Sequence, residues 1–158
     1  EQDDNNWVKE QREEVQGYSN ALQLIDPNFY SIPMYPIGSA MGTATDLQKL
    51  LQALLAEDGT PLFKDKKTID KIFEPTLYYP ETNIPRAANG LFNLPSKSQH
   101  VYGHGGNNFA FCASFYLVQK EDIGVLVFSN VKNESTVTKG IPEGIFGDLY
   151  RVHIVSKH

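Results

Sequence analysis

The stretch from Val101 to Asn130 constrains the fold more than any other part of the sequence. Between Phe109 and Gln119 the side chains divide between the two faces of an extended chain, and their aromatic and β-branched content is typical of a strand. A charged turn follows at Lys120–Asp122, and then Ile123–Phe128 is a continuous apolar run, as expected for a strand covered on both faces. The two runs predict a hairpin inside a larger sheet.

Directly before this hairpin lies a candidate site, formed by His104, Gly105 and Gly106. Glycines at such a position allow a backbone or a ligand to come close to the chain. An imidazole titrates near neutral pH, so a histidine beside this gap is suited to moving a proton. The alternative is that His104 is a structural histidine.

The composition limits what the chain can do. Its 158 residues fit one domain with a sizeable core, and no apolar run approaches the roughly 20 residues of a membrane span. The net charge is -5, and residues 1–16 hold six acidic and two basic side chains, which argues against nucleic acid as a partner. No His/Cys cluster has zinc spacing, no cofactor is expected, and Cys112 is predicted to be a small buried hydrophobe.

Helical periodicity is clearest after Met41. Thr45 and Gln48 form a capping-box pattern, and Asp58-Gly59 is expected to end the helix. An apolar stripe runs along it at Leu47, Leu50, Leu51, Leu54 and Leu55. Asp65 is predicted to cap a second, shorter helix that turns Ile69, Ile72 and Phe73 inward.

The remaining segments are less regular. Residues 76–100 are expected to be irregular apart from a short strand at Ala88–Phe92 and a turn at Pro95–Ser98. A last helix is predicted after Lys132–Ser135, with Pro142 tolerable only near its first turn. Its expected apolar face consists of Val137, Ile141, Ile145 and Leu149. The acidic segment 1–16 is predicted to hold a ragged helix around Trp7–Val15.

Three stretches occur in an order that resembles the penicillin-recognising serine hydrolases, which include class C β-lactamases, penicillin-binding proteins, D-amino-acid peptidases and related esterases. Pro36–Leu51 (PIGSAMGTATDLQKLL) resembles the segment that leads into a family helix, and Tyr102–Asn107 (YGHGGN) resembles the third motif. Ile123–Asn130 (IGVLVFSN) resembles the strand after it, and Gly17-Tyr18 matches a Gly-Tyr pair upstream. We interpret Tyr18-Ser19-Asn20 as this pair and not as the family's Tyr-x-Asn motif.

The resemblance implies an α+β fold, with an antiparallel sheet flanked by helices, and covers roughly residues 15–150. The family's nucleophile lies in a Ser-x-x-Lys motif at the start of a helix. In this chain the letters of that motif occur only at Ser129–Lys132 (SNVK), where the apolar run ends and the stretch resembles the family's strand, not the start of a helix. The chain is therefore expected to be a single, partial domain, residues 1–158, that corresponds to the C-terminal part of such an enzyme. The start of the chain does not resemble a signal peptide, so either a targeting segment was removed or the chain is part of something longer.

By the same resemblance, His104 takes the place of the motif's cation and assists proton movement near the nucleophile. Gly106 keeps the strand clear for the substrate, and the backbone N–H of Asn107 is one of two oxyanion-hole donors. Gly105 and Asn108 are expected to contact the substrate. Gly105 replaces a frequent Thr or Ser that can hold a substrate carboxylate, which favours a peptidase or esterase over a β-lactamase.

The expected function is thus acyl transfer by a complete enzyme to which this chain contributes no nucleophile, so the chain alone is expected to be inactive. The alternative is a non-catalytic binding module that keeps the fold. The expected partners are a small-molecule or peptide substrate and, along the Ile123–Phe128 edge, either the missing N-terminal segment or a second copy. We expect a homodimer or exchanged dimer there. An extracytoplasmic location follows by family analogy alone.

Overall fold

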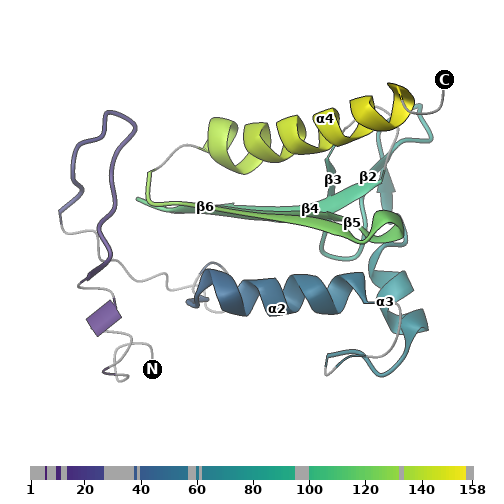
Figure 1. Cartoon of the computed structure of the whole chain (residues 1–158), viewed down its shortest axis with the longest axis horizontal. Helices are drawn as coiled ribbons and strands as arrows, with labels where there is room; N and C mark the ends of the chain where they lie inside the picture. Colours follow the sequence, from purple (N-terminus) through teal and green to yellow (C-terminus); the bar gives the residue numbers. More distant parts are fainter. Residues whose placement is uncertain are drawn as a thin grey trace.

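The chain forms one antiparallel sheet between helices, as a computed structural model shows (Figure 1). The structure describes residues 6, 10–11, 14–26, 38, 40–56, 60, 62–94, 100–131 and 134–155. The strands are β1 (Leu77–Tyr78), β2 (Pro85–Ala87), β3 (Phe92–Leu94), β4 (Val101–Asn107), β5 (Cys112–Val118) and β6 (Ile123–Ser129). The helices are α2 (Ala44–Leu55), α3 (Lys66–Ile72) and α4 (Ile141–Val155), with a short 3-10 turn at Gln119–Glu121 and a π-helical segment at Glu134–Gly140.

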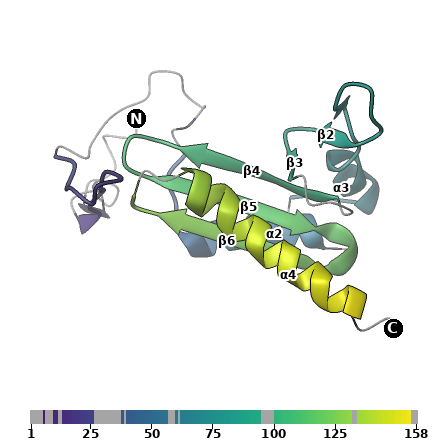
Figure 2. The ribbon, with the colours of Figure 1, turned by 90° about the horizontal axis from the view of Figure 1, so that it is seen from above.

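The six strands follow one another across the sheet in chain order, each antiparallel to the next. Helix α4 covers one face and α2 covers the other, while α3 lies at the end of the sheet near β2 and β3 (Figures 1 and 2). This arrangement confirms the predicted α+β class with an antiparallel sheet and flanking helices.

Two apolar clusters hold the helices to the two faces. On the α4 face, Phe146 is completely buried against Val101 and Tyr116. On the α2 face, Leu51 and Leu54 pack against Leu117 of the sheet. Burial of the Phe146 side chain contributes roughly 2–3 kcal/mol to the free energy of folding. A few large side chains of this kind hold the helices to the sheet.

The predicted hairpin is present, with one boundary moved. Its first strand begins at Cys112 and not at Phe109, because the N–H of Asn108 donates to the Phe111 carbonyl (2.8 Å) and closes a turn there. The charged turn is confirmed, with Asp122 in the left-handed region (φ 53°). Cys112 is buried, as predicted.

Residues 76–94 were wrongly predicted to be largely irregular, since they hold three short strands. The expected strand at Ala88–Phe92 is mostly a turn between β2 and β3, in which Gly90 has a φ of 82° and the Ala88 N–H donates to the Leu91 carbonyl (2.9 Å). Gly90 therefore favours a tight turn here, and this preference outweighs the strand tendency of the short apolar run. The predicted turn at Pro95–Ser98 lies outside the described residues.

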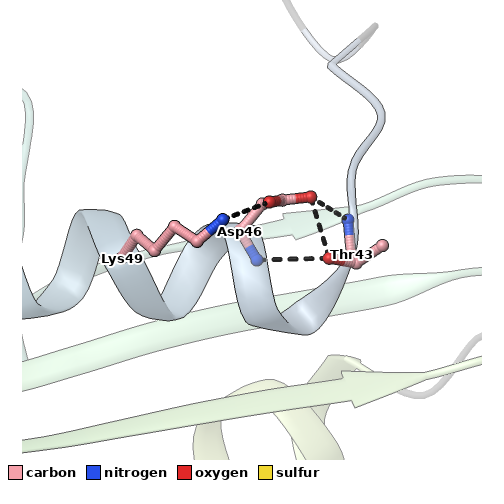
Figure 3. A network of polar contacts seen from close by, with 3 residues as sticks. All are labelled: Thr43, Asp46 and Lys49. Atoms are coloured by element: carbon pink, nitrogen blue, oxygen red, sulfur yellow. Dashed lines mark hydrogen bonds and ion pairs between the residues drawn. The ribbon is translucent and has the colours of Figure 1, made fainter.

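Helix α2 starts two residues earlier than its sequence pattern indicated. The cap is Thr43 and not Thr45, because Thr43 and Asp46 form the reciprocal box (Figure 3). The Thr43 Oγ1 accepts from the Asp46 N–H (3.2 Å), and Asp46 Oδ2 accepts from the Thr43 N–H (3.3 Å) and hydroxyl (2.8 Å). Lys49 adds an ion pair to the same carboxylate (3.2 Å). The helix ends at Leu55, and the predicted Asp58-Gly59 stop lies outside the described residues.

The predicted cap of α3 is confirmed, and the predictions for α4 are confirmed only in part. Asp65 caps α3 as predicted, accepting from the Thr68 N–H (2.9 Å), and Ile69 is fully buried. In α4, Pro142 lies in the first turn as expected. The predicted apolar face is wrong at Ile141 and Ile145, Val137 is half-buried, and the Leu149 side chain lies outside the described residues.

Among the described side chains of α4 and the π-helical turn before it, the buried ones are Thr138, Pro142 and Phe146, spaced by four residues. Ile141 and Ile145 are exposed (42% and 39%), one position away from that row. The wide π-helical turn at Glu134–Gly140 precedes α4, which contributes to this offset.

The acidic N-terminal segment is helical at residues 6, 10, 11 and 14, the positions of it that the structure describes before Val15. This agrees with the predicted ragged helix, although Trp7 lies outside the described residues.

Candidate functional site

The His-Gly-Gly stretch lies inside strand β4, where one edge of the strand is open. Strand β3 pairs with β4 only as far as Gly103, whereas β5 pairs with all of it. Beyond Gly103, no strand of the described part of the chain pairs with the outer edge of His104, Gly105 and Gly106. Figure 2 shows β4 continuing past β3 along this free side. The sequence alone placed these residues before a strand, and the structure places them on one.

The His104 side chain lies on the α2 face of the sheet. It is opposite Phe115 of β5, which belongs to the α2-face cluster. Its ring centroid is 5.4 Å from that of Phe92 on β3, with a tilt of 40°, and its side chain is exposed. On the same face at Gly106, no atom of the described residues lies within 4 Å of where a Cβ would be. The imidazole therefore stands beside an unobstructed length of strand edge.

The three glycines of the motif are not equivalent. A Cβ on Gly103 would overlap the Phe115 carbonyl oxygen and the Tyr116 ring, so this glycine is required by packing. A Cβ on Gly105 would make ordinary contacts of 3.6–4.0 Å on the α4 face, where Thr138 lies. Only Gly106 keeps open space on the face that carries His104.

The two asparagines have different surroundings. Asn107 is the exposed last residue of β4, opposite Cys112. Asn108 is half-buried in the turn, and its side-chain Nδ2 donates to the Gly38 carbonyl (3.3 Å) across 70 residues of sequence. The segment before α2 is thus held at the end of β4, and Asn108 positions it.

The same end of the sheet also receives the N-terminal segment. The Asn130 carbonyl accepts from the Tyr18 N–H (2.8 Å), and the Asn130 Nδ2 donates to the Gln16 carbonyl (3.0 Å). A Cβ on Gly17 would overlap that of Ala110, so only glycine fits there. All the stretches that carry the family resemblance therefore converge around the β4–β5 turn and the end of β6.

No family model matches this chain. No curated protein is significantly similar to it either. The function must therefore be argued from the geometry of the site itself.

A second feature lies at the opposite end of β4. A depression of about 250 Å³ is lined by His100, Tyr102, Val118 and residues of the α3 end. The His100 and Tyr102 rings are stacked there, with their centroids 6.0 Å apart. Burial, and to a smaller extent the neighbouring Tyr78, raises the pKa of Tyr102. The depression contains none of the residues predicted for the site, and it is smaller than most ligand pockets.

Within the described ranges, no group of three or more His, Cys, Asp or Glu side chains could hold a metal ion. Over the same residues, no helix is both long and apolar enough to cross a membrane.

Sequence reasoning missed one neighbour of the site. Phe92 contacts His104 because β3 pairs with β4 as far as Gly103, which brings the end of β3 beside His104. Residues 92 and 104 carry no local pattern that could reveal this pairing.

Proposed function

We propose that this chain is the C-terminal part of a serine hydrolase that works through an acyl-serine intermediate, and that it supplies the His-Gly-Gly motif of the site. The observation that carries the proposal is the open outer edge of β4 at His104–Gly106, with an exposed imidazole and clear space above Gly106 on one face. An extended substrate can pair with such an edge through its own backbone or acyl-amide groups.

The convergence of four separated stretches supports the same proposal. Gly17-Tyr18, the segment before α2, the β4 motif and the end of β6 meet at one end of the sheet, although they are far apart in the sequence. These are the stretches whose sequence order resembles that of the family. The β-lactamase-like fold is proposed on this ground.

Each residue then has a chemical role. His104 moves a proton between the serine, which another part of the protein provides, and the leaving group. Gly106 leaves room for the substrate, and Asn107 contributes a backbone N–H to the oxyanion hole. Gly105 contacts the substrate without a hydroxyl, while Asn108 acts by holding the Gly38 segment in place.

The substrate class that follows is a small ester or peptide acyl group. The exposed Phe92 ring beside His104 offers apolar contact, and Gly105 provides no hydroxyl for a carboxylate, so peptidase or esterase chemistry is favoured over β-lactam hydrolysis. The other partners proposed are, along β6, the nucleophile-bearing segment or a second copy. An extracytoplasmic location is proposed by analogy with the family.

The first test uses the chain by itself. The proposal places the nucleophile outside this chain, since Ser129, which begins the one Ser-x-x-Lys of the sequence, ends strand β6 and its hydroxyl is hydrogen-bonded to Val131. Incubation with a chromogenic ester and a chromogenic cephalosporin should therefore give no saturable turnover. Saturable turnover that disappears in His104→Ala would show that the chain carries its own nucleophile, and the proposal would fail.

The decisive test uses the longer protein read from the coding sequence upstream of Glu1. If a Ser-x-x-Lys motif is present there, His104→Ala and Gly106→Val should each lower kcat/KM by about 10²-fold or more. Both variants should keep their stability, since His104 is exposed and a Gly106 side chain meets no atom. Ile84→Ala, at an exposed position just before β2 and away from the site, is the control and should keep the activity.

Two results would favour the binding-module alternative. One is an upstream sequence without Ser-x-x-Lys and Tyr-x-Asn. The other is a longer protein that turns over neither the chromogenic ester nor the chromogenic cephalosporin. In an active longer protein, an unchanged kcat/KM in Gly106→Val would instead show that substrate does not bind in the open space above the strand.

A further inference from the structure

The depression at the start of β4 combines apolar walls with hydrogen-bond donors. Its apolar walls come from three parts of the chain: Phe73 and Pro75 after α3, Tyr102 of β4 and Val118 of β5. The Tyr102 ring lies 5.7 Å from the Phe73 ring and 6.0 Å from the nearly parallel His100 ring, measured between centroids. The walls therefore present aromatic surface, which favours a flat apolar group as ligand.

One of the donors is a buried amide that the protein leaves unpaired. The Nε2 of Gln119 is buried and has no hydrogen-bond partner among the residues that the structure describes. Such a group costs free energy unless an acceptor reaches it. Gln119 is half-buried and lines the depression, so a small rotation of its side chain turns the amide toward an oxygen placed there. The unpaired amide thus indicates a ligand that carries a hydrogen-bond acceptor.

The charge that lines the depression is positive. Lys120 contributes to the lining and is exposed, and no carboxylate of the described residues forms an ion pair with it. Glu74, Glu121 and Asp122 are close in sequence, but the described lining includes none of the three. Burial raises the pKa of Tyr102, so its hydroxyl keeps its proton at neutral pH and can also donate. A negatively charged acceptor fits these groups better than a neutral one, because charge strengthens the hydrogen bonds.

We propose that this depression binds a small aromatic carboxylate, with the ring against Tyr102 and the carboxylate at Gln119 and Lys120. Pockets for drug-sized ligands measure roughly 300–1,000 Å³, so the 250 Å³ here suits a single ring and not a peptide.

The two polar side chains of the site are held by one short turn. They lie on the 3-10 turn that joins β5 to β6, which the Asp122 N–H closes by donating to the Gln119 carbonyl (3.2 Å). Figures 1 and 2 show α3 beside this end of the hairpin, so the donors and the apolar walls face one another across the depression. None of the site residues belongs to His104–Asn108, and the inference does not depend on the proposed hydrolase function.

The test is a titration of the isotope-labelled chain with benzoate, followed by NMR. We expect saturable shifts of the Gln119 side-chain amide and the Lys120 backbone amide, whereas the Gly106 and Asn107 amides should not move. Benzamide has the same ring without the charge, and acetate has the charge without the ring. Each should therefore bind at least about tenfold more weakly than benzoate.

Two variants separate the contributions of the polar groups. Gln119→Leu should weaken benzoate binding about tenfold, and it should stay folded, since the Nε2 has no hydrogen bond within the described chain to lose. Lys120→Met should weaken binding about threefold and reduce its dependence on salt. Lys67→Met, which removes an exposed lysine of α3 outside the described lining, is the matched control and should leave benzoate binding unchanged.

The proposal is overturned if benzoate gives no saturable shift at Gln119, or if it binds Gln119→Leu and Lys120→Met as tightly as the unchanged chain. Equal binding of benzamide and benzoate would overturn the assignment of a carboxylate ligand. Shifts confined to Gly106 and Asn107 would place benzoate at the candidate hydrolase site, which overturns the proposal equally.

Discussion

The glycines of β4 provide the sharpest test of the packing around the candidate site. Gly103→Ala introduces a Cβ that overlaps the Phe115 carbonyl oxygen and the Tyr116 ring. The carbonyl belongs to the paired neighbour strand, so it cannot move aside unless β4 and β5 separate. Overpacking of this kind costs about 1–3 kcal/mol or more.

Gly106→Ala is the matched comparison in the same strand. Its Cβ meets no atom within 4 Å, and removing a glycine from a strand is favourable by roughly 0.5–1 kcal/mol. We therefore expect the unfolding free energies of the two variants to differ by about 3 kcal/mol, with Gly103→Ala the less stable.

Urea unfolding followed by circular dichroism measures this difference directly. The m-values should stay equal, since both variants expose the same surface on unfolding. If Gly103→Ala is as stable as Gly106→Ala, β4 and β5 do not pack as described, and the assignment of open space above Gly106 loses its support.

Three further predictions concern polar groups. Thr43→Ala should destabilise the chain by about 1 kcal/mol through loss of the helix cap, whereas Thr45→Ala, at the position that the sequence pattern favoured, should be nearly neutral in the same denaturation assay. The Thr43 hydroxyl, and after it Lys49, lower the pKa of Asp46 from its ordinary value of 3.8. The ionised Asp46 carboxylate therefore stabilises the fold above pH 3.8, and this stabilisation is lost as the pH falls through the lowered pKa. Thr43→Ala should flatten the dependence of the unfolding free energy on pH in that acidic range. Ser114→Ala should leave the unfolding free energy unchanged or raise it, because the buried Ser114 hydroxyl has no hydrogen-bond partner within the part of the chain that the structure describes. A loss above about 1 kcal/mol would show that the hydroxyl is bonded.

Periodicity predicted the elements that bury a continuous apolar stripe. The leucines of α2 and the alternating residues of β5 gave the right element types because their packing follows the local repeat. The ends of these elements were predicted less accurately. Thr43 and Thr45 are both capping residues by type, and the choice between them depends on the reach of Asp46.

The elements that were missed depend on tertiary pairing. Residues 101–107 form a strand although Gly-His-Gly-Gly-Asn has little strand preference, because β5 provides a complete ladder beside it. For the same reason the sequence could single out His104 and its glycines but could not separate Gly103, fixed by packing, from Gly106. The contact with Phe92 also requires the register of β3.

The order of the strands has a consequence for how the chain folds as it is synthesised. Because β1 to β6 neighbour one another in chain order, each strand can join the sheet as soon as it is made, and every strand pair closes only a short loop. The contacts of Asn130 with Gln16 and Tyr18 are different, since they span more than a hundred residues. Closing so long a loop costs the most chain entropy of any contact described, and it requires β6 to be complete. The N-terminal segment therefore attaches last, and it is the first part of the described chain that should detach when stability is lowered.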